Sequence, residues 1–132
     1  MKHKRRPFRA SRDSGAAAVE FALIVPALLL ILFGIIEFSR LYNEQISLTN
    51  AARSAVRVMA ISNDQADAVD AAIAASPALN PALTAANIAF SPTACAVGAT
   101  MTVTINYNAS LLTGWFGTTF ALTGEGAMPC GG

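Results

Sequence analysis

Three sets of residues have side-chain types and spacings that could support chemistry. One acid, Glu20, lies inside an otherwise apolar stretch, Cys95 and Cys130 flank a segment of alternating residues, and aspartates recur at positions 64, 67 and 70. A carboxylate in an apolar stretch requires a cationic partner, two cysteines form a disulfide or help to hold a metal, and clustered acids occur in calcium sites.

Catalysis and metal binding are disfavoured by the residue types that are missing. The one histidine is His3, and no lysine follows Arg12, so a hydrolase arrangement with a His or Lys base cannot be built from the rest of the chain. Asp64, Asp67 and Asp70 lack the glycine and the closing glutamate of a calcium loop. We therefore expect a non-enzyme with no catalytic residue, no metal site and no cofactor.

The element that must position Glu20 is the apolar run from residue 16 to residue 36. At about 1.5 Å per helical residue it reaches about 30 Å, the thickness of the hydrocarbon core of a bilayer. Residues 1–15 carry six basic side chains against Asp13, and basic residues before a span stay on the cytoplasmic side. This predicts a single-pass membrane protein in contact with lipid, whose residues beyond Ile36 are extracytoplasmic.

Two alternatives apply to the same N-terminal region. The basic residues could form a nucleic-acid-binding arm, but no basic or aromatic pattern continues after them, so we expect no nucleic-acid partner. A secretory signal that is removed usually has a shorter apolar region followed by a small-x-small site. We therefore expect an anchor that is retained.

The residues around Glu20 also form a recognisable pattern. Gly15 is followed by four small or apolar residues and then by Glu20 and Phe21, and an Asn-Ala-Ala-Arg segment follows the apolar run at residues 50–53. Together with the basic leader, this pattern over about residues 14–60 resembles the TadE-like family of minor pilins, or pseudopilins, of tight-adherence (Flp-type IV) pilus systems.

The resemblance implies processing by a prepilin peptidase that cuts after Gly15. Ala16 would become the new N-terminus, with Glu20 and Phe21 completing the recognised segment. It also implies a structural subunit of the inner membrane that contacts other pilin or pseudopilin subunits through its N-terminal helix, together with the inner-membrane pilus assembly machinery. The other hypothesis is an uncleaved, signal-anchored periplasmic scaffold or binding protein of an envelope secretion complex.

A physical argument supports a role for Glu20 in assembly. A carboxylate at the membrane centre costs about 2.5–3.5 kcal/mol on insertion scales, and the ammonium liberated at Ala16 would offer an ion-pair partner within the chain or in a neighbouring subunit. Glu20 would then set the axial register between subunits. The alternative is that Glu20 only reaches the headgroups, near the positive end of the helix dipole.

Beyond the span, the pattern predicts an α+β fold with a long helix, a small helix and an antiparallel sheet. The expected organisation is a basic cytoplasmic leader at 1–15, a transmembrane and stalk helix at 16–61 and an extracytoplasmic domain at 62–132. Within that domain we expect, in order, a helix over 65–75 capped by Asn63 or Asp64, a helical turn over 82–87 and strands over 88–90, 100–107 and 119–127.

Several finer expectations concern packing. The long helix should present an apolar stripe running from Phe38 to Met59, and the nearby charges Glu37 and Arg40 should lie on a solvated face. The last strand should be weakened by its two glycines. The rings of Trp115 and Phe116 should dock on the long helix or face lipid or a partner subunit.

The two cysteines are expected to form a disulfide. Pairing the last two strands with Tyr107 opposite Thr119 would bring Cys95 and Cys130 within reach of each other. An even cysteine count outside the cytoplasm favours such a bond, whereas a metal site or a redox pair would need a CxxC motif, a nearby histidine or more cysteines.

Overall fold

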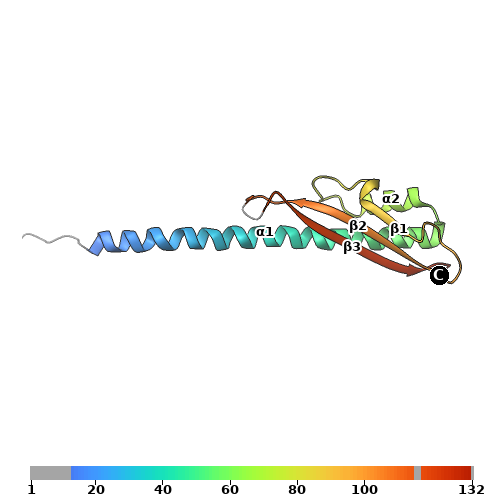
Figure 1. Ribbon diagram of the computed structural model, residues 1–132, viewed down its shortest axis with the longest axis horizontal. Coiled ribbons are helices and arrows are strands. Elements are labelled where there is room, and N and C mark those ends of the chain that lie inside the picture. Colours follow the sequence, from blue (N-terminus) through green and yellow to red (C-terminus); the bar gives the residue numbers. More distant parts are fainter. Residues whose placement is uncertain (1–12, 115–116, 132) are drawn as a thin grey trace, which may run out of the picture. The chain divides into compact units, whose positions relative to one another are not determined.

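The computed structural model describes residues 13–114 and 117–131. Its elements follow the order α1 (Asp13–Ser62), α2 (Gln65–Ala74), the 3-10 turn η1 (Ala85–Asn87), β1 (Ile88–Ser91), β2 (Thr100–Ser110) and β3 (Thr119–Pro129) (Figure 1). The predicted α+β class is confirmed. The chain forms two compact units, of which the second begins at Ile36. The leader up to residue 12, and the rings of Trp115 and Phe116, lie outside the described residues.

Helix α1 is 50 residues long and agrees with the prediction of one helix over 16–61. Among the described residues it is the one helix long and apolar enough to cross a membrane, with a mean hydropathy of 2.7 over its most apolar 18 residues. None of that window is buried in the structure, and the side chains of Leu23, Ile31 and Ile35 are more than half exposed. A single-pass membrane anchor accounts for this exposure, because a soluble protein rarely leaves so large an apolar surface uncovered.

Helix α2 begins at a side-chain cap. Asp64 Oδ1 accepts hydrogen bonds from the backbone N–H groups of Ala66 at 2.8 Å and Asp67 at 3.2 Å. These bonds satisfy two donors that a helix start leaves free. Ala68 and Ala72 on the buried face join the core.

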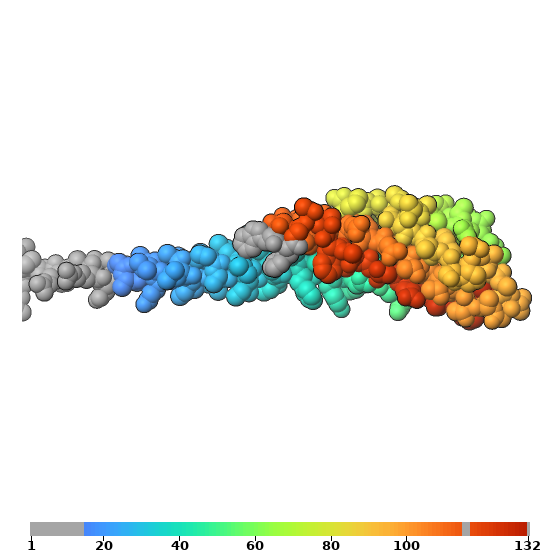
Figure 2. Space-filling view, in the orientation of Figure 1, coloured from blue at the N-terminus to red at the C-terminus, as the bar shows by residue number. Residues whose placement is uncertain are grey.

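The three strands form one antiparallel sheet in the order β1-β2-β3. The predicted inward face of β2 is confirmed, since Met101, Val103, Ile105 and Tyr107 are all buried. These side chains pack in one core with α1 residues such as Leu48. Figure 2 shows β2 and β3, in orange and red, lying over the later part of α1.

The predicted register between β2 and β3 is wrong by three residues. Tyr107 pairs with Leu122 instead of Thr119, and Ser110 pairs with Thr119. Because successive side chains point to opposite faces of a strand, an odd shift also exchanges the two faces of β3. Leu122, Gly124 and Gly126 are therefore the residues that face inward.

The two glycines of β3 allow its backbone to contact the backbone of α1. A Cβ on Gly124 would lie 2.5 Å from the carbonyl oxygen of Leu48, and a Cβ on Gly126 would lie 2.8 Å from that of Ala52. Neither approach leaves room for a side chain. The glycines that the sequence suggested would weaken the strand are thus the positions where it can touch the helix.

Cys95 and Cys130 form a disulfide, with Cα atoms 5.5 Å apart. The bond does not arise from strand pairing in the way expected, because Cys130 lies opposite Ala99, whose carbonyl oxygen accepts the N–H of Cys130 at 2.8 Å. A turn between Ala96 and Ala99 brings Cys95 back to this point. The N–H of Cys95 donates to the side chain of Asn63, at the end of α1, at 2.6 Å.

Candidate functional site

The residues of the predicted processing segment lie at the start of α1. Gly15, Ala16, Glu20 and Phe21 are all exposed, and the bond between Gly15 and Ala16 lies in the first turn of the helix. Gly15 has no positive φ, and nothing lies within 4 Å of a Cβ added to it. The fold therefore places no demand for glycine at this position, although glycine costs a helix about 1 kcal/mol relative to alanine.

Ala16 and Glu20 lie on one face of α1. Residues four apart are neighbours on a helix surface, separated by about 6 Å along its axis. An ammonium at Ala16 would thus have the Glu20 carboxylate on its own side of the helix. The exposure of Glu20 also leaves this carboxylate accessible to a second chain.

The first residues of the second unit hold a buried acid that the sequence did not reveal. Glu37 is 8% exposed, and its Oε1 and Oε2 accept the backbone N–H of Leu112 at 2.9 and 3.2 Å. The expectation of a solvated Glu37 is therefore wrong. Its donor comes from a loop 75 residues later, so no local pattern around Glu37 could have identified the contact.

The apolar stripe on α1 also differs at its first position. Leu48, Ala52, Ala55 and Met59 are buried as predicted, but Phe38 is 70% exposed. Glu37, adjacent to Phe38, takes the position that faces the loop after β2. Phe38 instead stacks with Tyr42 one turn later, with ring centroids 6.3 Å apart.

Arg40 does not pair with Glu37 but with Glu44, through Arg40 Nη2 and Glu44 Oε1 at 3.4 Å. The Glu44 side chain is 12% exposed, and burial raises its pKa above the ordinary value; Arg40 opposes this shift and Glu37 adds to it. Among the described residues, no protein group pairs with Glu44 Oε2 or Arg40 Nη1. The ion pair therefore has one acceptor and one donor left over for water or another polar group.

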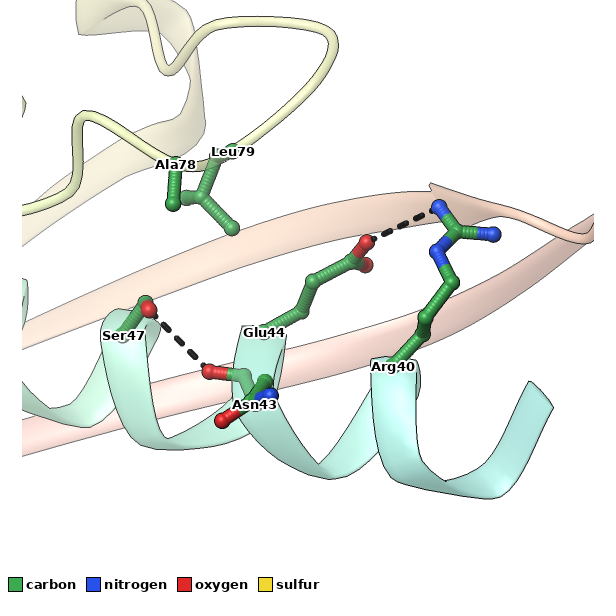
Figure 3. Close-up of a pocket in the computed structure, with 6 residues that line it drawn as sticks. All are labelled: Arg40, Asn43, Glu44, Ser47, Ala78 and Leu79. Carbon is green, nitrogen blue, oxygen red and sulfur yellow. Dashed lines mark hydrogen bonds and ion pairs between the residues drawn. The ribbon is translucent and has the colours of Figure 1, made fainter. Parts of the chain in front are cut away.

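These two residues line a groove of 220 Å³ together with Asn43, Ser47, Ala78 and Leu79 (Figure 3). Figure 3 shows the Arg40 and Glu44 side chains directed toward each other, with Ala78 and Leu79 on the facing loop. The lining offers hydrogen bonds and one pair of opposite charges but no histidine, cysteine or lysine. Such a set of side chains is suited to binding polar groups.

The sheet makes a polar contact close enough to Glu44 for the charge of Glu44 to act on it. The hydroxyl of Tyr107 donates to the carbonyl oxygen of Pro81 at 2.9 Å, and burial is the main cause that raises the pKa of Tyr107. The charge of Glu44 raises this pKa further. The Tyr107 bond fixes the chain around Pro81 against β2.

The three aspartates do not gather into a site. Asp64 caps α2, while Asp67 and Asp70 are exposed. In residues 13–114 and 117–131, no group of three metal-ligating side chains occurs. Asp64 therefore has a structural role at the start of α2.

Comparison with known proteins gives one match. The family model described as TadE-like protein matches residues 15–57, which is about a third of the chain. No curated protein and no solved structure matches the chain. The match begins at Gly15, continues through the whole apolar run and ends at Arg57 of α1. It confirms the resemblance inferred from the residues, in that residues 15–57 of this chain are similar to the TadE-like family.

Proposed function

We propose that this chain is a minor pilin-like (pseudopilin) structural subunit that serves the assembly of a tight-adherence, Flp-type IV pilus at the inner membrane. The observation that carries the proposal is the TadE-like match, which starts on Gly15 and includes Glu20, the apolar run and its helical continuation. The family is structural and associated with pili.

Processing by a prepilin peptidase after Gly15 is the first step of the proposed mechanism. The cut removes the basic leader and creates an ammonium at Ala16. This charge compensates Glu20 in the apolar surroundings, where a carboxylate is costly unless a cation pairs with it. Pairing of Ala16 in one subunit with Glu20 in the next would fix the axial offset between neighbouring helices.

The partners in this mechanism are other pilin or pseudopilin subunits and the inner-membrane assembly machinery. The uncovered apolar side chains of α1 up to Ile36 are shielded first by lipid and later by neighbouring helices. Helix association in a bilayer has little hydrophobic driving force. Movement of the span from lipid into a fibre therefore requires work supplied by the machinery.

Replacement of Gly15 tests the processing step. Gly15→Leu should block the cut, so that the protein retains its leader on a denaturing gel of cell membranes. Gly34→Leu is the matched control, because nothing lies within 4 Å of a Cβ added to Gly34 either; this variant should be cut normally. Normal processing of Gly15→Leu would refute the assigned site.

Replacement of Glu20 tests assembly separately. Glu20→Gln preserves the shape of the side chain and removes its charge, so membrane insertion should be normal while co-purification with partner subunits should decrease. Glu125→Gln, in the exposed part of β3, controls for a general effect of losing one acid. Undiminished co-purification of Glu20→Gln would refute the register mechanism.

An uncleaved, signal-anchored scaffold of an envelope secretion complex is the second candidate. One observation favours it: α1 passes without a break through the bond between Gly15 and Ala16, so a peptidase must unwind a helical turn to reach that bond. In this case the leader would remain in the wild-type protein. The two candidates thus differ in the N-terminus of the protein found in membranes.

A further inference from the structure

Large apolar side chains are exposed where the second unit begins. Phe38 is 70% exposed, Tyr42 60%, Leu112 62% and Phe120 50%. Phe38 and Tyr42 belong to α1, Leu112 follows the end of β2, and Phe120 is the second residue of β3. We call Phe38, Leu112 and Phe120 the interfacial patch.

The position of Leu112 along α1 is set by a hydrogen bond. Its backbone N–H is held by the buried Glu37 carboxylate, and Glu37 is the residue directly after Ile36, where the apolar run ends. One helical residue corresponds to about 1.5 Å. Leu112 therefore lies level with the end of the apolar run.

The position of Phe120 follows from the glycine contacts. Gly124 lies against Leu48 and Gly126 against Ala52, so a step of two residues along β3 covers the same distance as a step of four residues along α1. Phe120 is four residues before Gly124 in β3, which corresponds to eight residues before Leu48 in α1. Phe120 therefore lies level with Arg40. That is about 6 Å beyond Ile36.

The positions of Leu112 and Phe120 along α1, measured from Ile36, coincide with the interfacial layer of a bilayer. The headgroup regions add about 10–15 Å to a hydrocarbon core of about 30 Å, or about 6 Å on each side. Phe38, two residues past Ile36, lies about 3 Å beyond the apolar run. The whole patch thus falls within the layer in which aromatic side chains of membrane proteins concentrate.

Charge distribution supports contact with lipid. No charged residue occurs in the sequence from Asn108 to Gly124. The one acid at this level, Glu37, is removed from the surface by its bond to Leu112. The nearest cation, Arg40, is paired with Glu44. An apolar rim with a buried acid and a paired arginine is complementary to a bilayer surface.

We propose that the interfacial patch lies in the headgroup layer on the extracytoplasmic side of the membrane, so that the second unit contacts the bilayer through its sheet as well as being anchored by α1. Phe38 follows the last residue of the apolar run, Ile36, by two positions in the same helix, which is the argument for lipid over a protein partner. The Glu37–Leu112 hydrogen bond holds the loop at this depth. The proposal rests on membrane anchoring by α1, as the proposed function does.

Spin-label accessibility in vesicles tests the proposal with the full chain. Both native cysteines are in the disulfide, so a nitroxide can be attached at one new cysteine in each variant after oxidation. The variants are Leu112→Cys and Phe120→Cys in the patch, Val97→Cys at the other end of β2 as the exposed apolar control, and Leu28→Cys in the apolar run as the lipid control. Val97 is 99% exposed, and β2 separates it from Leu112 by about 35 Å.

The readout is collision with oxygen, which concentrates in lipid, compared with a water-soluble nickel complex, in vesicles of phosphatidylethanolamine and phosphatidylglycerol. Labels at positions 112 and 120 should lose nickel collisions relative to position 97 and approach the ratio at position 28. Native mobility on a non-reducing gel confirms that each variant retains its disulfide.

The other outcomes separate the patch from the anchor. A lipid-like ratio of oxygen to nickel collisions at position 28, together with aqueous ratios at positions 112 and 120, would refute membrane contact by the patch and leave the membrane anchor intact. An aqueous ratio at position 28 would refute both. Protection of 112 and 120 only after a partner subunit is added would overturn the lipid proposal in favour of protein docking.

Discussion

Alanine at Gly124 should destabilise the contact between β3 and α1 more than any other single methyl group added to this strand. The added Cβ would lie 2.5 Å from the carbonyl oxygen of Leu48, 2.6 Å from its carbonyl carbon and 2.9 Å from its Cβ. Ordinary contacts are about 3.5–4.0 Å, so the strand or the helix must move by about 1 Å. Two of the three obstructing atoms belong to the backbone, and no side-chain rotation relieves them.

The magnitude follows from the cost of overpacking. An added methylene in a well-packed core costs about 1–3 kcal/mol. In Gly124→Ala the added Cβ is attached to the backbone of β3 and clashes with the backbone of α1, so we expect the upper end of this range, about 3 kcal/mol. For a domain of this size, 1 kcal/mol corresponds to about 4–8 °C in Tm. Gly126→Ala should cost less, because its nearest contacts are 2.8, 2.9 and 3.0 Å.

Thermal unfolding of the full chain in detergent, followed by circular dichroism in the range of sheet absorption, measures the effect. Glu125→Ala is the matched control, since Glu125 lies between the two glycines on the exposed face of β3 and should change the free energy of unfolding by less than about 0.5 kcal/mol. If Gly124→Ala lowered Tm no more than the control Glu125→Ala does, the close-approach argument would be refuted. A larger loss of Tm for Gly126→Ala than for Gly124→Ala would also refute it.

Three further predictions concern polar groups and the disulfide. Glu37→Ala should cost about 1–3 kcal/mol of unfolding free energy because it leaves the Leu112 N–H without an acceptor, and it should speed hydrogen exchange of that amide, whereas Glu37→Gln retains an acceptor. Cys130→Ser should cost about 4 kcal/mol in denaturant unfolding, since the Cys95 cross-link closes a loop of 35 residues. Glu44→Gln should remove a loss of stability that the wild type shows as pH rises above the ordinary glutamate pKa of 4.5, in the same assay.

The direction of the pH effect follows from proton linkage. Burial raises the pKa of Glu44 above its ordinary value of 4.5, so the folded state holds this proton to higher pH than the unfolded chain does. Stability contributed by Glu44 is therefore lost as pH rises through the raised pKa. A stability difference between wild type and Glu44→Gln that is the same at pH 5 and pH 7 would contradict this.

Contrary results for the other two predictions are equally specific. Equal hydrogen exchange of the Leu112 amide in Glu37→Ala and Glu37→Gln would show that the carboxylate does not hold the loop. For the disulfide, wild type treated with reductant is the control and should lose as much stability as Cys130→Ser. A reduced wild type as stable as the oxidised one would contradict the loop-closure argument.

Local patterns were sufficient for the elements of this fold. The strict alternation from Thr100 to Tyr107 predicted both the strand and its buried face, and Asp64 was among the expected caps of α2. These features depend on residues close together in the sequence. The same holds for the apolar run of α1, whose composition alone indicates a span.

Contacts between distant segments were not predictable in the same way. The register of β3 depends on the close approach of Gly124 and Gly126 to α1, whereas the alternating pattern of β2 accommodates several registers. Glu37 was expected in solvent because its hydrogen-bond donor is Leu112, far along the chain. In each case a residue that is ordinary by local criteria is placed by a tertiary contact.

The N-terminus of the mature protein tests the central claim most directly. Intact-mass spectrometry of the wild-type chain, purified from membranes of cells that carry its assembly system, should give a protein that begins at Ala16 and retains Glu20 as its fifth residue. A protein that still carries residues 1–15 would contradict the account.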